Sequence, residues 1–346
     1  MKIFEDEFLY NKRINTLPFR AHYIPFDKKD KIKHRYGIID KNSSSRLYSL
    51  NGIWNFKAFK KYQDVTNLDI SFSGNDRIDV PASVQTRGYD YIQYLNCRYP
   101  FPFHPPYIDI DNPLFFYSRS FIIEKKEGRI IIVFEGVDNA FYLFINKIKV
   151  GYSNIAHSKS EFDITDYVKI GENIIDVLVL KYSASSYFEC QDKFRMSGIF
   201  RDVYLLYRDE KHITDYRFIT HIKKDKGIIN FINNSEVDIS LKFKNKSFIV
   251  SPHKDIDIIV NHPRLWNEED PYLYNFSLSH GDEIIYERVG IREISTSDGV
   301  FKINGKHIKL KGVNRHESHP VNGATVSIKD TYNDLKMMVD YYIKNK

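Results

Sequence analysis

The 346-residue chain has few of the residues that cross-link or anchor a protein. Its only two cysteines, Cys97 and Cys190, make one possible pair, which in a chain of this length does not indicate a disulfide framework. No run of about 18 apolar residues occurs, so the sequence excludes a membrane-spanning helix. Residues 1–13 are charged throughout and lack the apolar stretch of a signal peptide, so we expect a cytoplasmic protein that binds no membrane.

A strong excess of one charge is also missing. The 51 Lys and Arg against 45 Asp and Glu give a net charge of +6, and the lysines are spread along the chain, which argues against nucleic-acid binding. Aromatic residues are abundant instead, with 25 Tyr and 25 Phe, and this favours β-sandwiches over helical bundles. The length allows two or three domains with a sizeable core.

Residues 47–206 contain short apolar or alternating runs separated by turn signals. The strand candidates are 128–134, 140–145, 161–164 and 173–182. Many short strands without a long segment of helical period predict a β-sandwich. At the tip of one hairpin stands Asn146-Lys147, where a type I′ turn needs positive φ at both central residues. We therefore expect either another turn type or a left-handed Lys147, at a cost of about 1 kcal/mol.

The flanking segments differ in pattern. Residues 1–45 are polar and irregular, with Pro18 and Pro25 interrupting any helix, and by themselves they indicate a flexible arm. Residues 208–293 alternate again, and about seven short strands in roughly 85 residues suit an immunoglobulin-like sandwich. Here we expect Trp266 to pack in the core or between domains.

The C-terminal segment combines a hairpin signal, a polar cluster and a helix. Residues 301–313 alternate around Asn304-Gly305, the pattern of a hairpin turn that leads into a strand. The polar run 314–319 follows it, either as a charged loop or as a place where the scaffold presents chemistry. The helix is indicated by one apolar stripe, with Ser327 or Asp330 available to begin it. The stripe consists of Leu335, Met338, Val339, Tyr342 and Ile343.

Five stretches resemble, in the same order, the β-galactosidases of glycoside hydrolase family 2. They are SLNGIWNF at 49–56, VPASVQ at 80–85 followed by GYD at 88–90, YPFP at 99–102 with its prolines to 113, QDKFRMSGIFRDV at 191–203, and GVNRHESHP at 312–320. The resemblance implies a mostly β chain: a jelly-roll sugar-binding β-sandwich, an immunoglobulin-like β-sandwich, and the first β/α unit of an incomplete TIM barrel. The corresponding domains are an ordered arm at 1–45, then 46–208, 209–293 and 294–346.

The resemblance also implies the chemistry, which is hydrolysis of terminal β-D-galactose residues in lactose-type β-galactosides. A retaining glycosidase needs two carboxylates about 5 to 5.5 Å apart. In the family both catalytic glutamates come from later barrel strands, which correspond to positions beyond residue 346. We therefore expect no catalytic residue in this chain and no activity from the chain alone.

Three residues match substrate-binding positions of the family. Asn96 resembles an asparagine that hydrogen-bonds galactose, and a turn-forming asparagine is the alternative. Asp192 resembles an aspartate that binds a galactose hydroxyl and a sodium ion, and a structural ion pair with Arg195 is the alternative. His319 resembles a histidine that contacts the sugar. The residues before it, Arg315, His316 and Glu317, are expected to form a buried network that positions it.

Metal binding is the least complete part of the pattern. The resemblance implies magnesium and sodium in the complete enzyme, but the partner ligands of both ions belong to the rest of the barrel. A second, peripheral magnesium position corresponds to Ala184, which has no ligating side chain, so we expect that position to be lost. The spacing His316-Glu317-Ser318-His319 is not the zinc motif His-Glu-x-x-His. This chain alone is expected to hold no cofactor.

The partners implied are a β-galactoside, a separate polypeptide that carries the remaining barrel, and further copies in a homo-oligomer. One hypothesis is that the chain is the N-terminal part of a β-galactosidase from a broken or split gene. A second is a non-catalytic galactoside-binding or complementing fragment. A third, β-glucuronidase or β-mannosidase specificity on the same architecture, is less favoured by the quoted stretches.

Overall fold

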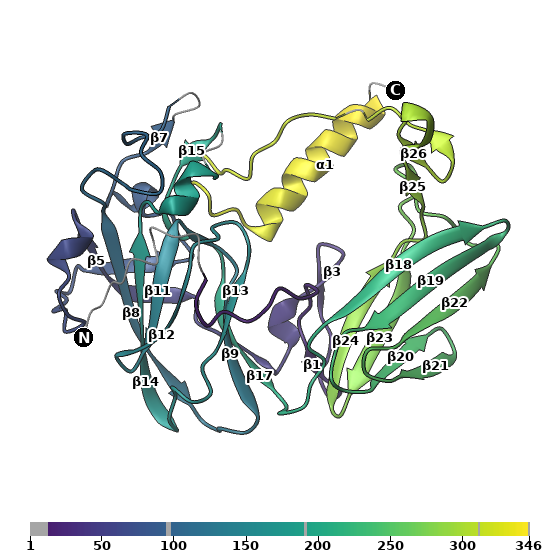
Figure 1. The fold of residues 1–346 in the computed structure, drawn as a ribbon, viewed down its shortest axis with the longest axis horizontal. Helices are drawn as coiled ribbons and strands as arrows, with labels where there is room; N and C mark the ends of the chain where they lie inside the picture. The colour runs from purple at the N-terminus through teal and green to yellow at the C-terminus, as the bar shows by residue number, and fades with distance from the viewer. Residues whose placement is uncertain (1–12, 95–97, 190–191, 311, 345–346) are drawn as a thin grey trace.

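A computed structural model describes residues 13–94, 98–189, 192–310 and 312–344, and most of its regular structure is β (Figure 1). Two sandwiches stand side by side, and one long helix, α1, slants through the upper part of the view between them. None of the helices described has the length and apolar character needed to cross a membrane. Short 3-10 turns occur at Lys41–Ser43, Tyr62–Asp64, Val84–Arg87, Ala184–Tyr187 and Ser297–Gly299.

The first sandwich packs a six-stranded sheet against a four-stranded sheet. The six strands, in spatial order, are β12 (Ile148–Ser153), β11 (Ala140–Ile145), β14 (Gly171–Leu180), β8 (Leu114–Ile123), β5 (Gly52–Phe59) and β6 (Arg77–Val80). The four are β13 (Ser160–Asp163), β9 (Arg129–Phe134), β17 (Val203–Arg208) and β4 (Leu47–Ser49). All pairings are antiparallel, and the strands predicted from the sequence are confirmed.

The large sheet is buried on both faces. Phe141 and Leu143 of β11 point into the core between the two sheets, whereas Tyr142 and Phe144 point the other way into a second apolar cluster. The irregular segment 59–72 covers that outer face with partly buried Phe59, Tyr62, Leu68, Ile70 and Phe72. This cover explains why β11 is apolar at every position, since alternation with polar residues is expected only where one face meets water.

The hairpin tip after β11 keeps the tight turn. Asn146 and Lys147 have φ angles of 51° and 66°, so Lys147 is held in the left-handed region. The Asn146 amide donates to the Tyr167 carbonyl (3.0 Å) and its oxygen accepts from the Ile174 N–H (3.0 Å), which fixes the first turn residue. The Lys147 ammonium pairs with Asp69. The second of the two expected outcomes is therefore the one observed.

The second sandwich has a three-stranded and a five-stranded sheet. The first contains β18 (Tyr216–Lys223), β19 (Lys226–Asn233) and β22 (Asp255–Asn261). The second contains, in order, β1 (Phe26–Asp27), β24 (Glu283–Val289), β23 (Tyr274–His280), β20 (Ile239–Phe243) and β21 (Lys246–Val250). Its core is formed by Phe231, Leu241, Phe276 and their neighbours. Trp266 packs closely against Gly290, at the C-terminal end of this sandwich. A Cβ at position 290 would lie only 2.9 Å from the Trp266 side chain.

The described part of the N-terminal arm is ordered, so the flexible arm suggested by its composition is wrong there. Ile14 forms a bridge with Tyr152, β1 extends the five-stranded sheet, and β2 (His34–Arg35) pairs with β3 (Ile38–Ile39). Arg20 binds Glu161 of β13 through both carboxylate oxygens at 2.8 and 2.7 Å. Backbone pairing and a bidentate ion pair compensate for the few apolar residues of the arm.

The C-terminal segment follows the sequence predictions only in part. The hairpin is confirmed: β25 (Ile294–Ser295), β26 (Lys302–Ile303) and β27 (Lys306–His307) form one small sheet, with Asn304 and Gly305 at positive φ. The expected strand up to residue 313 is wrong. Residues 308–310 and 312–313 have no regular structure, and Leu310 and Val313 are exposed. A barrel strand depends on hydrogen bonds to parallel neighbours, and the described residues supply none.

Helix α1 (Ile328–Lys344) forms as predicted. The Ser327 hydroxyl accepts from the Asp330 N–H at 3.2 Å while the Asp330 carboxylate accepts from the Ser327 N–H at 3.1 Å, a reciprocal cap. Leu335 and Val339 of the apolar stripe are exposed, and Tyr332 instead meets Tyr36 of the arm with ring centroids 5.0 Å apart.

Candidate functional site

A two-stranded ribbon at one end of the first sandwich supports the candidate site. β7 (Gln93–Tyr94) pairs antiparallel with β15 (Phe194–Arg195), so that Tyr94 lies opposite Phe194 and Gln93 opposite Arg195. Because side chains alternate across a strand, one face of the ribbon carries the two aromatic rings and the other carries the two polar side chains. The ribbon therefore has an aromatic outer face and a polar inner face.

Asp192 lies directly before this ribbon. Its carboxylate is exposed and accepts a hydrogen bond from the Tyr94 hydroxyl. The alternative interpretation, an ion pair with Arg195, is not what the described contacts show, because Arg195 lies on the inner face of the ribbon. Asn96, the other substrate-binding candidate on this end of the sandwich, lies outside the described residues, as do Cys97 and Cys190.

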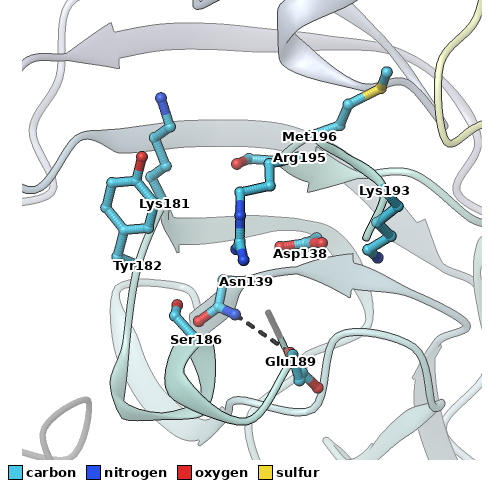
Figure 2. Close-up of a pocket in the computed structure, with 10 residues that line it drawn as sticks. Asp138, Asn139, Lys181, Tyr182, Ser186, Glu189, Lys193, Arg195 and Met196 are labelled. Atoms are coloured by element: carbon cyan, nitrogen blue, oxygen red, sulfur yellow. Dashed lines mark hydrogen bonds between the residues drawn. The ribbon is translucent and has the colours of Figure 1, made fainter. Parts of the chain in front are cut away.

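Beneath the ribbon is a small polar cavity of about 20 Å³, room for a single water molecule (Figure 2). Figure 2 shows the Arg195 side chain extending toward Asn139, between Tyr182 and Asp138. The Nε and Nη2 atoms of Arg195 are buried and have no hydrogen-bond partner among the described residues. The Asn139 amide donates to Glu189 at 3.3 Å. The cavity thus places a guanidinium beside carboxylates without joining them directly.

The acidic groups around this cavity are hard to ionise. Burial, followed by repulsion from Asp138, raises the pKa of Glu189 to about 7. Burial likewise raises the pKa of Asp138 to about 6, although Lys193 and Arg195 act in the opposite direction. Burial and the neighbouring Lys193 lower the pKa of His157 to about 4. Near pH 7 the neutral His157 therefore accepts a hydrogen bond from the Lys193 ammonium.

His319 sits in a tight turn that is closed by backbone bonds to Gly323 in both directions, at 2.8 and 2.9 Å. Its Nδ1 faces the N–H groups of Val321 and Asn322, both at 3.1 Å. Because these groups can only donate, the neutral ring carries its proton on Nε2 and can donate from there. The turn therefore fixes the tautomer of His319.

This turn is docked on the first sandwich. The N–H of Ala324 donates to the Ser83 hydroxyl at 3.1 Å. Gly323 has φ 63°, and a Cβ at this position would lie 2.3 Å from the Met196 sulfur and 2.9 Å from Thr86. The docking surface is itself assembled by Gln85, whose side-chain oxygen accepts from the Ser197 N–H at 2.8 Å. Three of the five quoted stretches, 80–85, 191–203 and 312–320, thus meet at this place.

The buried network expected from Arg315, His316 and Glu317 is not observed. His316 and Glu317 are exposed, Arg315 pairs with Asp334 of α1 at 2.8 Å, and Glu317 pairs with Arg201 at 2.7 Å. Burial of this motif requires flanking barrel strands, and none is present among the described residues. The Glu317–Arg201 pair nevertheless adds a second tie between the His319 turn and the first sandwich.

The described residues do not form a metal site. No three His, Cys, Asp or Glu side chains within them lie close enough together to hold an ion. Asp192 offers one exposed carboxylate that already accepts from Tyr94, whereas a hard cation takes six or more oxygen ligands. Ala184, at the peripheral position, is buried and has no donor side chain. We therefore assign no step to a metal ion.

Sequence reasoning missed Tyr94, Met196 and Arg201 as parts of this site. All three stand inside the quoted stretches or beside them, but their residue types suggest packing or surface charge. Tyr94 contacts Asp192 across 98 positions of the chain. No periodicity in a single sequence reports contacts at that separation.

Comparison with known protein families covers nearly the whole chain. The profile described as "Glycosyl hydrolases family 2, sugar binding domain" matches residues 47–209. "Glycosyl hydrolases family 2" matches 209–292, and "Glycosyl hydrolases family 2, TIM barrel domain" matches 294–345. The chain belongs to glycoside hydrolase family 2. These matches confirm the family that the five stretches predicted. They also confirm the mostly β fold class.

Two curated relatives in family 2 are similar over most of the chain. A protein named "Beta-galactosidase" from Actinobacillus pleuropneumoniae is 37% identical over 342 residues, which cover 95% of this chain and 33% of the relative. Another of the same name from Staphylococcus xylosus is 37% identical, with coverages of 94% and 34%. The chain therefore spans about a third of the length of these relatives.

Solved structures support the fold of this family 2 chain. A structure titled "Uncultured Clostridium sp. Beta-glucuronidase" matches 84% of the chain with a TM-score of 0.65 and 22% identity, and covers 52% of that protein. A family 2 β-galacturonidase from Eisenbergiella tayi matches with a TM-score of 0.60 and 22% identity, with coverages of 85% and 51%. At these identities the similarity establishes the architecture alone.

Proposed function

We propose that this chain is the N-terminal part of a family 2 β-galactosidase, which hydrolyses terminal non-reducing β-D-galactose residues with retention once the rest of the barrel is supplied. The observation that carries the proposal is the docking of the His319 turn on the sugar-binding sandwich, through Gly323 against Met196 and the Ser83 hydroxyl. It brings the His319 turn to the strand that follows Asp192. The names of the curated relatives favour galactose as the sugar.

The roles of the described residues follow from their chemistry. Asp192 accepts a hydrogen bond from a galactose hydroxyl, and the Nε2–H of His319 donates to another, as carboxylates and neutral imidazoles do. Asn96 is the third galactose-binding residue in this proposal. The two catalytic glutamates, the magnesium site and the other sodium ligands belong to the remaining barrel, so this chain contributes binding and positioning. Lactose-type galactosides are the proposed substrates.

The exposed stripe of α1 supports the need for a second part. Leu335 and Val339 of this stripe are exposed together with Leu310 and Val313, although apolar side chains of this size normally pack. In the proposal they pack against the remaining β/α units, as the helices of a TIM barrel cover its strands.

The test is hydrolysis of a chromogenic β-galactoside by the purified chain, first alone and then mixed with a polypeptide that supplies the rest of the barrel. Activity in the mixture only is the expected result. Hydrolysis by the chain alone above background would contradict the assignment of both catalytic carboxylates to the missing part. A mixture that forms a complex but does not hydrolyse the galactoside would overturn the proposal.

A second candidate is a non-catalytic galactoside-binding or complementing fragment. The exposed Asp192 and the aromatic outer face of the β7–β15 ribbon favour it, because both are accessible without the barrel. Binding of a galactoside by the chain, without turnover in any mixture, would support this candidate. Turnover of a β-glucuronide in place of a galactoside would support the third, less favoured specificity.

A further inference from the structure

The β7–β15 ribbon exposes two large rings side by side. Tyr94 is 52% exposed and Phe194 is 55% exposed, and their centroids are 5.7 Å apart with ring planes inclined by 57°. On the opposite face Gln93 accepts a hydrogen bond from the Tyr182 hydroxyl at 2.8 Å, and Arg195 enters the cavity. The inner face thus fixes the ribbon to the sandwich. The outer face presents two exposed aromatic rings whose planes are inclined to each other.

This aromatic pair has a hydrogen-bond acceptor at its edge. The Tyr94 hydroxyl donates to the Asp192 carboxylate, which is itself exposed and keeps lone pairs for another donor. An aromatic surface with one acceptor at its rim fits a molecule that has an apolar face and hydroxyl donors around its edge. A pyranose ring has this character, since its axial C–H groups form an apolar face.

We propose that Tyr94 and Phe194 form a stacking subsite for the leaving-group sugar of a β-galactoside. The inference rests on the proposed function, in which Asp192 holds the galactose unit. The Tyr94 hydroxyl meets the Asp192 carboxylate while the Tyr94 ring lies against Phe194, so we assign the two rings to the sugar next to the galactose and not to the galactose itself. The subsite therefore favours galactosides whose leaving group is a second pyranose over those with a small one.

The test compares lactose with methyl β-D-galactoside, whose leaving group has no ring. Affinities for both are measured by ligand-observed NMR on the chain itself and on its Phe194→Leu variant, which keeps Asp192 and the Tyr94 hydroxyl. We expect a loss of roughly threefold to tenfold for lactose, the effect of one aromatic contact, and less than twofold for the methyl glycoside. Phe194→Tyr should retain the affinity for lactose.

Tyr48→Leu is the matched control, because Tyr48 is 41% exposed on β4 of the same sandwich, and it should change neither affinity. Equal losses for both ligands in Phe194→Leu would overturn the subsite, as would unchanged affinity for lactose or no lactose binding by the unsubstituted chain. Because this readout needs no turnover, it is independent of the hydrolysis test. A mixture that fails to hydrolyse galactosides would leave the binding result standing.

Discussion

A buried ion pair joins the two sandwiches, and the loss of either partner alone should cost several kcal/mol. Arg208, at the end of β17, donates from Nε and Nη2 to the two carboxylate oxygens of Glu283, at the start of β24, both at 2.7 Å. The side chains are only 1% and 0% exposed. Nη2 also donates to the Ile213 carbonyl at 2.7 Å, and the Tyr23 hydroxyl donates to the same carbonyl. The pair therefore connects both sandwiches and the arm.

Removing one partner leaves the other charge buried without compensation. For such pairs the loss is about 3–5 kcal/mol, so we expect Arg208→Met and Glu283→Leu each to destabilise the chain by this amount. The double variant leaves no charge behind, and replacement of both partners by apolar side chains is often close to neutral. Its cost should lie several kcal/mol below the sum of the two single costs.

Urea unfolding measures these costs, and the chain's two tryptophans report on the two sandwiches separately. Trp54 is buried in the first, with its indole N–H donating to the Leu50 carbonyl at 2.9 Å, and Trp266 packs against Gly290 at the exit of the second. With a slope of about 3 kcal/mol per molar urea, each single variant should lower the midpoint by about 1 to 1.7 M. Trp54→Phe and Trp266→Phe backgrounds assign each transition.

Two results would refute this reasoning. One is a loss below about 1 kcal/mol in Arg208→Met, the range of an exposed ion pair. The other is a double variant whose cost equals the sum of the singles, because additivity is the mark of residues that do not interact.

Two further variants test the turn after β11 and the acid beneath the β7–β15 ribbon. Lys147→Gly should raise the thermal midpoint, because it relieves about 1 kcal/mol of left-handed strain and loses in exchange the exposed pair with Asp69 and a weaker attraction to Asp176; a lower midpoint would contradict this. For Glu189, burial raises the folded pKa from 4.5 to about 7, so its contribution to stability is full below about pH 4.5 and is lost as the pH rises through 7. Glu189→Gln should therefore be about 1 kcal/mol more stable than the parent chain at pH 8, after allowance for partial solvent screening, and no more stable at pH 4.5. Urea midpoints across this range provide the measurement, and equally steep profiles for both chains would show that Glu189 is not responsible.

Local patterns allowed much of the fold to be predicted. The run that became β9 was recognised by its nearly continuous apolar character, and the run that became β14 by its period of two, each with turn residues nearby. Helix α1 needed one apolar stripe and a Ser327-Asp330 cap. These features are encoded within a few residues of one another, so a single sequence is enough to find them.

The sequence failed where structure depends on distant partners. Residues 308–310 and 312–313 alternate as a strand should, but a strand forms only beside another strand, and the part of the chain that the structure describes offers them no neighbour. Arg208 and Glu283 are 75 positions apart, and each by itself looks like a surface charge. At the site, Asp192 was found through its matching stretch, whereas its contact with Tyr94 depends on the pairing of β7 with β15.

The glycine at the end of the His319 turn implies an order of events in folding. Gly323 fits against Met196 and Thr86 only after the segment around Val84 has joined that around Ser197, where the Val84 N–H donates to the Ser197 carbonyl at 2.9 Å. The turn thus has no surface to rest on until the first sandwich exists. Domains fold as units, and the N-terminal domain emerges first during synthesis. The folded first sandwich therefore provides the surface that orients His319 when the later segment packs on it.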